Sequence, residues 1–180
     1  MVTATTIITK RLTLEPLTLD DVQAIYKIAQ DKESIEDFQY VAHSLDDVKR
    51  WLEPSYHSPE ELTWVIHKQT RVMGLFEVGL EAEYSDVKTN VCRIGYFFDY
   101  KEHNQGYGTE ALRGVVDWLF NHTSIERIEA GVTLHNVSSY RILEKVGFTR
   151  EKIVEGNWKW YGQVYDSAYY YLLKPPTAEH

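Results

Sequence analysis

The feature that most constrains the fold of this chain is a buried strand that turns through two glycines directly into a helix. Residues 91–99 form an apolar, aromatic run, and apolar residues recur at helical spacing from 106 to 120. Between the two lies Gln105-Gly106-Tyr107-Gly108-Thr109. The first N–H groups of a helix have no intrahelical partners, and glycines before them let a phosphate approach closely. The turn therefore predicts a phosphate-binding site, although it lacks the spacing of the P-loop and of the dinucleotide fingerprint.

The remaining segments predict one mixed α/β domain over residues 1–180. Strands are also expected at 7–15, 62–68, 72–80, 127–134, 148–154 and 164–173, and helices at 18–31, 44–53 and 136–146. Pro54 is expected to end the second of these helices, and Gly147 to cap the C-terminus of the third. Residues 32–43 are expected to form a loop or short helix, and 81–90 a polar loop. The chain has no repeat or low-complexity linker, and its 180 residues suffice for one core.

Composition and charge narrow the function classes. The formal net charge is −8 and no run of Lys or Arg occurs, which argues against a nucleic-acid-binding protein. An acidic surface suits a cationic acceptor such as an amine, and it equally suits plain solubility. No apolar run approaches the ~20 residues of a membrane span, and the N-terminus lacks the layout of a signal peptide. We therefore expect a cytoplasmic protein that binds neither membranes nor nucleic acids.

The histidines and the single cysteine predict neither a metal site nor a cysteine nucleophile. The seven histidines have neither HxxxH nor HExxH spacing. The single cysteine, Cys92, excludes an internal disulfide and fits a reducing compartment. Because Cys92 lies within a predicted strand, we expect a buried structural thiol rather than a nucleophile.

A second motif, LHNVSSYRILEKVGFTRE at 134–151, pairs with the glycine turn. Together the two resemble the GNAT superfamily of N-acetyltransferases, whose phosphate loop has the pattern Gln/Arg-x-x-Gly-x-Gly/Ala, here 103–108. The later family pattern is matched by Asn136, Ser139, Ile142, Glu144, Lys145, Gly147 and Phe148. The resemblance covers about 7–174 and is closest to the RimJ/RimL branch, which acetylates the N-termini of ribosomal proteins. That branch is matched by TKRLTLEPLTLDD near the start and by Gly162, Asp166 and Tyr170 near the end.

The resemblance implies a single-domain α/β fold with a mixed, mostly antiparallel central sheet, splayed central strands and helices on both faces. It implies acetyl-CoA as cosubstrate, a primary amine as acceptor, direct attack in a ternary complex and a homodimer. A main-chain N–H, that of Phe98, is expected to face the carbonyl oxygen of the acetyl group. The residues expected to bind the cosubstrate are Phe97, Phe98, Asp99, His103, Asn104, Gln105, Gly106, Tyr107, Gly108, Thr109, Asn136 and Ser139.

The chain departs from the family pattern at the position of the catalytic proton donor. Many members carry a tyrosine just before the Glu-Lys pair, where it protonates the departing thiolate, and Leu143 stands there in this chain. Ser139 and Tyr140 share the helix face of Asn136, so we expect Ser139 as proton donor and Tyr140 as the second candidate. The alternative for Ser139 is a packing hydroxyl bonded to its own backbone. Glu77 is the candidate base, acting through water.

Several alternatives stay open at this stage. Tyr96 either lines the acceptor pocket or packs in the sheet, and His103 replaces the Gln or Arg that contacts phosphate in the family. Apart from an N-acetyltransferase, the chain could be a CoA-binding sensor or interaction module without catalysis, or a nucleotide-phosphate module. The acceptor could be a protein N-terminus, an aminoglycoside, a polyamine or a free amino acid, because variable segments such as 31–58 form acceptor pockets.

Overall fold

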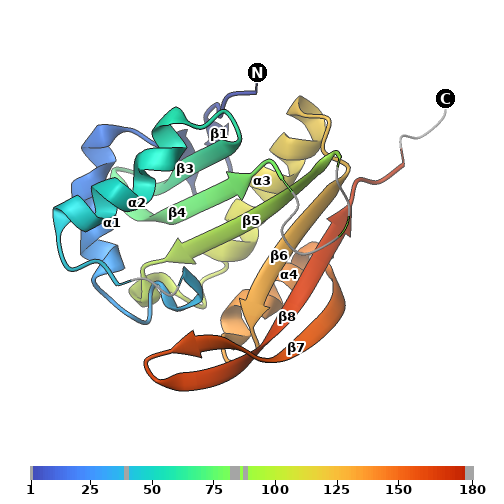
Figure 1. Cartoon of the computed structure of the whole chain (residues 1–180). Coiled ribbons are helices and arrows are strands. Elements are labelled where there is room, and N and C mark those ends of the chain that lie inside the picture. The colour runs from blue at the N-terminus through green and yellow to red at the C-terminus, as the bar shows by residue number, and fades with distance from the viewer. Residues whose placement is uncertain (1, 39–40, 82–85, 87–88, 177–180) are drawn as a thin grey trace.

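An eight-stranded sheet forms the centre of the molecule, with the strand order β1-β2-β3-β4-β5-β6-β8-β7 (Figure 1). The computed structural model describes residues 2–38, 41–81, 86 and 89–176. All neighbouring strands are antiparallel except β5 and β6, which are parallel. The expected mixed, mostly antiparallel sheet is therefore confirmed. The strands are β1 (Ile7–Ile8), β2 (Thr13–Pro16), β3 (Glu61–Lys68), β4 (Arg71–Gly79), β5 (Val91–Phe98), β6 (Arg127–Thr133), β7 (Thr149–Trp160) and β8 (Gln163–Leu173).

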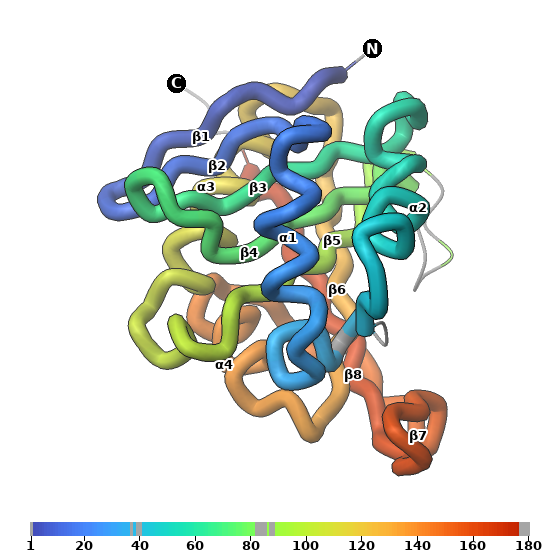
Figure 2. The backbone as a smooth tube through the Cα atoms, turned by 90° about the vertical axis from the view of Figure 1, so that its left-hand side faces the viewer, coloured from blue at the N-terminus to red at the C-terminus, as the bar shows by residue number. Residues whose placement is uncertain are grey.

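Helices cover both faces of this sheet, and Figure 2 shows α1 and α2 on one side of the strands and α3 and α4 on the other. Because successive side chains of a strand point to opposite faces, β4 contributes Phe76 to the core under α3 and Leu75 to the core under α1 and α2. The α-helices are α1 (Val22–Ala29), α2 (Leu45–His57), α3 (Tyr107–His122) and α4 (Val137–Val146). Short 3-10 helices are η1 (Leu19–Asp21), η2 (Glu36–Phe38) and η3 (Tyr100–Glu102).

The two central strands separate halfway along their length. β5 pairs with β6 only over 91–94 and 127–130. Beyond that point, the rest of β5 stays paired with β4, and the rest of β6 stays paired with β8. The facing edges of the two strands therefore have main-chain groups with no strand opposite them, as expected for splayed central strands.

The expectation of one strand over 7–15 was wrong, because the chain forms the hairpin β1–β2 there. Thr9 N–H donates to the Leu12 carbonyl at 2.9 Å, and Leu12 N–H donates to Thr9 Oγ1 at 3.1 Å. These bonds close a turn, and Ile7 then pairs with Leu14. The alternating pattern of this segment fits two short paired strands as well as one long strand.

Two predicted element ends were also wrong. Helix α2 continues past Pro54 to His57, because an exposed proline removes only its own N–H and its carbonyl still accepts from Ser58 N–H at 2.8 Å. Strand β7 runs to Trp160 instead of Val154, through irregularities at 150–152 and 154–158. The predicted loop at 81–90 lies largely outside the described residues.

Candidate active site

The glycine turn has the geometry expected of an anion site. Gly106 is the N-cap of α3 and has a left-handed conformation, with φ of 80°. The next three N–H groups, of Tyr107, Gly108 and Thr109, belong to the first helical turn and have no intrahelical acceptor. A side chain at Gly108 would collide with α4, since a Cβ there would lie 2.5 Å from Ile142 Cδ1. The Ile142 side chain would have to turn aside for any larger residue at position 108, so the turn and α4 are in close contact there.

A cavity of about 420 Å³ lies beside this turn, at the end of the gap between β5 and β6. It is lined by residues of the turn, of the last part of β5, of the start of α4 and of the segment around η2. All the residues expected to bind the cosubstrate line it except Asp99 and Gln105. The sequence-based prediction thus brought together side chains from β5, α3 and α4 that do lie around one cavity.

Asp99 and Gln105 instead hold the loop that leads into the turn. Asp99 accepts from Lys101 N–H at 3.1 Å and binds Arg71 Nη2 at 2.9 Å. Arg71 also forms an ion pair with Glu102. Gln105 donates from Nε2 to Glu102 Oε2 at 3.2 Å. These contacts give both residues a structural part in shaping the loop.

The open edge of β5 presents the main-chain groups of Phe98 to the gap. Asp99 N–H donates to the Met73 carbonyl of β4 at 2.8 Å. Successive N–H groups of a strand point to opposite edges, so Phe98 N–H points away from β4. The Phe98 carbonyl on the same edge accepts from His103 Nε2 at 3.2 Å. His103 therefore binds the strand edge, at the sequence position where the family pattern has a Gln or Arg.

The start of α4 brings two hydroxyl groups together in the cavity. Asn136 Oδ1 caps the helix by accepting from Ser139 N–H at 3.1 Å and from Ser138 Oγ at 3.0 Å. Ser139 Oγ donates to Tyr96 Oη at 3.4 Å, and Tyr96 Oη lies 3.3 Å from the Ser139 carbonyl. Tyr96 stacks on Phe76, with ring centroids 5.3 Å apart. Sequence reasoning had left Tyr96 undecided, although its alternation with Phe97 places it on the α3 side of the sheet.

Three residues named in the catalytic reasoning lie outside the cavity lining. Tyr140 packs partly buried against the core under α3, and Leu143 is only 1% exposed within that core. Glu77 lies on β4, opposite Gly95 of β5, on the face covered by α1 and α2. Burial and the neighbouring Glu61 raise the pKa of Glu77 to about 7, against the opposing effect of Arg93. Glu77 is thus on the other side of the sheet from Tyr96.

Other sequence-based expectations concern Cys92, metals and membranes. Cys92 is fully buried, and burial together with Glu129 raises the pKa of its thiol to about 12, so it is a structural thiol as expected. In the part of the chain that the structure describes, no group of three or more His, Cys, Asp or Glu side chains could hold a metal ion. None of its described helices is both long and apolar enough to span a bilayer.

Comparison with known proteins agrees with this fold. Residues 11–149 match the acetyltransferase (GNAT) domain model. Over 86 residues, 48% of each chain, the sequence is 44% identical to the probable N-acetyltransferase YjcK of Bacillus subtilis. The alignment thus covers about half of that relative. The match to the domain model covers most of the chain, which therefore belongs to the GNAT acetyltransferase family.

Two solved structures share the fold over almost the whole chain. A spermidine N-acetyltransferase from Vibrio cholerae, in complex with CoA and spermine, has a TM-score of 0.79 at 18% identity, covering 91% of this chain and 95% of its own. An acetyltransferase from Salmonella typhimurium that modifies the N-terminal serine of a 50S ribosomal subunit protein has a TM-score of 0.81 at 15% identity, covering 95% and 100%. The class that fold and family define is an N-acetyltransferase.

Proposed function

We propose that this chain transfers the acetyl group of acetyl-CoA to a primary amine, by direct attack of the amine in a ternary complex. The observation that supports this best is the single cavity that contains both the phosphate-binding turn and the open edge of β5. An elongated cosubstrate with phosphates at one end fits such a cavity, because helix N–H groups bind phosphate and a strand edge binds amide groups. Acetyl-CoA supplies the acetyl group as a thioester.

Different residues of the chain bind the phosphates, bind the carbonyl oxygen and protonate the leaving thiolate in this proposal. The N–H groups of Gly106, Tyr107, Gly108 and Thr109 bind phosphate, and Phe98 N–H donates to the carbonyl oxygen, which gains negative charge during the transfer. Ser139, held by Tyr96, relays a proton to the thiolate and regains one from water in the cavity, so that its hydroxyl is restored after each transfer. A thiol has a pKa near ~8.5, so the help that the thiolate needs is modest. Tyr140 is the weaker candidate donor, since it does not line the cavity.

Glu77 is the base in this proposal and acts through water on the attacking amine. Its pKa, raised to about 7, suits a group that must accept a proton near neutral pH. Glu77 lies on the face covered by α1 and α2 and outside the cavity lining, so in this proposal water must carry the proton from the amine to it.

For the acceptor, we propose a protein N-terminal amine, as in the RimJ/RimL branch. The supporting observations are the motifs shared with that branch and the fold shared with the Salmonella enzyme that modifies an N-terminal serine. A polyamine is the alternative, supported by the fold shared with the spermidine enzyme and by the carboxylates of Glu33 and Glu36 in the cavity lining. Such a protein would act in the cytoplasm.

The test is acetyl-CoA turnover against a panel of amines, followed as release of the CoA thiol with a thiol reagent. The buried Cys92 should give little background in this assay. The panel contains spermidine, an aminoglycoside, free amino acids and peptides with either a free or a blocked N-terminus. We expect turnover with free N-termini and none with blocked ones. CoA binding without any turnover would favour the sensor or interaction module, and absence of CoA binding would refute the proposal.

A further inference from the structure

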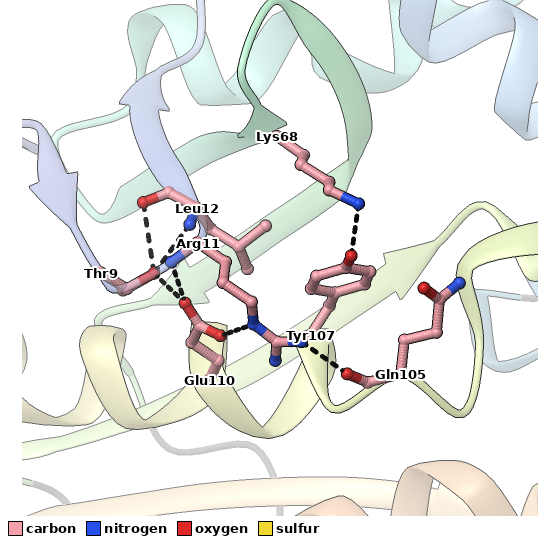
Figure 3. Close-up of polar contacts among 7 residues, drawn as sticks. All are labelled: Thr9, Arg11, Leu12, Lys68, Gln105, Tyr107 and Glu110. Atoms are coloured by element: carbon pink, nitrogen blue, oxygen red, sulfur yellow. Dashed lines mark hydrogen bonds and ion pairs between the residues drawn. The ribbon is translucent and has the colours of Figure 1, made fainter.

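The first turn of α3 is tied to the β1–β2 hairpin through Glu110, as Figure 3 shows. Glu110 Oε1 accepts from Thr9 Oγ1 at 2.7 Å and from Arg11 N–H at 2.6 Å, and Glu110 Oε2 binds Arg11 Nε at 2.6 Å. Partial burial raises the pKa of Glu110, but the hydrogen bonds from Thr9 and Arg11 outweigh it and lower the pKa overall. The carboxylate is therefore charged at neutral pH and holds the hairpin turn against the helix.

Arg11 extends from this ion pair to the residues on either side of Gly106. Its Nη1 donates to the Gln105 carbonyl at 2.8 Å, and its guanidinium carbon lies 4.4 Å from the centre of the Tyr107 ring. Its Nη2 would lie 3.2 Å from a Cβ on Gly106. One side chain thus contacts the residues before and after the left-handed residue and packs against that residue itself.

The bond to the Gln105 carbonyl determines where the next N–H points. The Gln105 carbonyl and the Gly106 N–H belong to one planar trans peptide, so they point in opposite directions. Because Arg11 holds the carbonyl toward the β1–β2 hairpin, the Gly106 N–H points away from the hairpin. Gly106 itself lines the cavity. The contact that fixes this donor therefore comes from a residue that does not line the cavity.

Tyr107 is held from its other side by Lys68 at the end of β3. Lys68 Nζ donates to Tyr107 Oη at 2.5 Å and lies 4.9 Å from the ring centre (Figure 3). The ring is only 5% exposed, between Arg11 and Lys68. The side chain of Tyr107 thereby anchors the first helical residue, whose N–H is one of the donors of the turn.

We propose that Arg11 is a positioning residue for the phosphate-binding turn. By holding both the Gln105 carbonyl and Glu110, it maintains the left-handed conformation of Gly106 and aims the following N–H donors into the cavity. The role is geometric, because the charge of Arg11 is balanced by Glu110 at 2.6 Å and contributes little long-range attraction for phosphate. The inference rests on the proposed function only in taking the phosphates of CoA as the bound anion.

The variant Arg11→Lys tests this directly, because it keeps the charge but cannot bridge the carbonyl and the carboxylate together. Amide hydrogen exchange over 103–110 is measured without ligand, and CoA affinity is measured by calorimetry. We expect exchange in the turn to rise and CoA binding to weaken by about tenfold, the loss of a charge-assisted hydrogen bond. The KM for acetyl-CoA should rise with kcat at saturation nearly unchanged.

The matched control is Arg50→Lys on α2, where Arg50 pairs with Asp47 at 2.5 Å and is 74% exposed. In Arg50→Lys, amide exchange over 103–110 and CoA affinity should both equal those of the parent. Wild-type exchange and CoA affinity in Arg11→Lys would overturn the proposal. If the parent itself binds no CoA, the proposed function fails, and the exchange measurement still decides whether Arg11 holds the turn.

Glu110→Gln weakens the same Arg11–Glu110 ion pair by changing the residue on α3. The same measurements on this variant replace those on Arg11→Lys if Arg11→Lys does not fold. Because Arg11 and Glu110 act as one unit here, the double variant should bind CoA no more weakly than the weaker single variant. Losses that multiply would show two independent effects and would contradict the proposal.

Discussion

The residues proposed for the chemistry lie on two different faces of the sheet. Tyr96 and Ser139 bring hydroxyl groups to the cavity on the side of α3 and α4. Glu77 lies on the neighbouring strand β4 and faces α1 and α2, and the pKa of its carboxyl group is raised to about 7. Each group can be removed by a single substitution, so the proposed roles can be tested one at a time.

The raised pKa of Glu77 predicts a pH-dependent effect of Glu77→Gln on stability. The folded protein holds this proton up to a pKa of about 7, whereas the ordinary value is 4.5. The native state therefore binds more protons between these values, and the wild-type free energy of unfolding falls across this range as pH rises. Relative to wild type, Glu77→Gln should gain up to about 3 kcal/mol from pH 4 to pH 8.

Denaturant unfolding at several pH values measures this difference, with the exposed Glu60→Gln as control. A constant difference between wild type and Glu77→Gln would contradict the raised pKa. If Glu77 is also the base, the rise of kcat/KM with pH near 7 should vanish in the variant.

Ser139→Ala should lower kcat by at least about a hundredfold, the lower range of general acid assistance, while CoA affinity stays nearly unchanged. Tyr96→Phe should lower kcat too, because the hydrogen bond to Tyr96 Oη holds the Ser139 hydroxyl in position in the cavity. Since the two form one unit, the double variant should be no slower than the slower single variant. Tyr161→Phe, at an exposed tyrosine, is the control. If Ser139→Ala turns over within a few-fold of the parent at every pH, Ser139 only packs.

Among the secondary structure elements, α4 combines a structural and a proposed binding role at its first residues. Asn136 caps the helix through Oδ1, and Gly147 ends it in a left-handed conformation with φ of 108°. Both ends had been predicted from the sequence, because caps depend on residues within one helical turn. The proposed binding role belongs to the amide group of the same Asn136 side chain.

Asn136→Asp separates the two roles, since the carboxylate can still accept the Ser139 and Ser138 hydrogen bonds but has no amide donor. If the amide binds the cosubstrate, Asn136→Asp should keep its stability and lose CoA affinity, by about 0.5–1.5 kcal/mol for one hydrogen bond. Asn136→Ala should lose both affinity and about 1 kcal/mol of stability. Ser44→Ala, which removes the cap of α2, should lose stability alone. Full CoA affinity in Asn136→Asp would leave capping as the only role.

Two of the elements that were predicted wrongly, the β1–β2 hairpin and β7, depend on contacts between residues distant along the chain. The turn between β1 and β2 is held by Glu110, about a hundred residues away from Thr9 and Arg11, and no local pattern carries that information. The length of β7 depends on irregular pairing with β8, where Gly156 N–H binds Asp166 Oδ1 at 2.8 Å. Most of the residues expected to bind the cosubstrate do line the cavity, because two motifs with local signatures supply them, whereas the lining from Glu33, Ser34, Glu36 and Phe38 was not predicted residue by residue. The sequence left two alternatives for Tyr96 and predicted no role for Arg11, since each contacts a partner far away in sequence.

At the scale of the whole molecule, the sheet consists of two parts that are joined only by the short pairing between β5 and β6. Strands β1–β5 form one part and β6–β8 the other, and they pair only between 91–94 and 127–130. The cavity lies where the pairing between β5 and β6 ends. Phe98 and the glycine turn line it on one side, and Asn136 and Ser139 line it on the other. A ligand that fills the cavity contacts both parts, so its binding should hold them together.

CoA should therefore stabilise the whole molecule and protect both sides of the gap, beyond the turn that binds phosphate. A ligand that binds only the native state at a hundred times its Kd adds about 2.7 kcal/mol to the free energy of unfolding, which raises Tm. Amide exchange should slow in 95–98 of β5 and in the first turn of α4 as well as in 105–109. ATP shares phosphates with CoA but has no pantetheine arm, so it should protect at most the turn. Protection by CoA that is confined to the turn would mean that the open edge of β5 does not bind the cosubstrate.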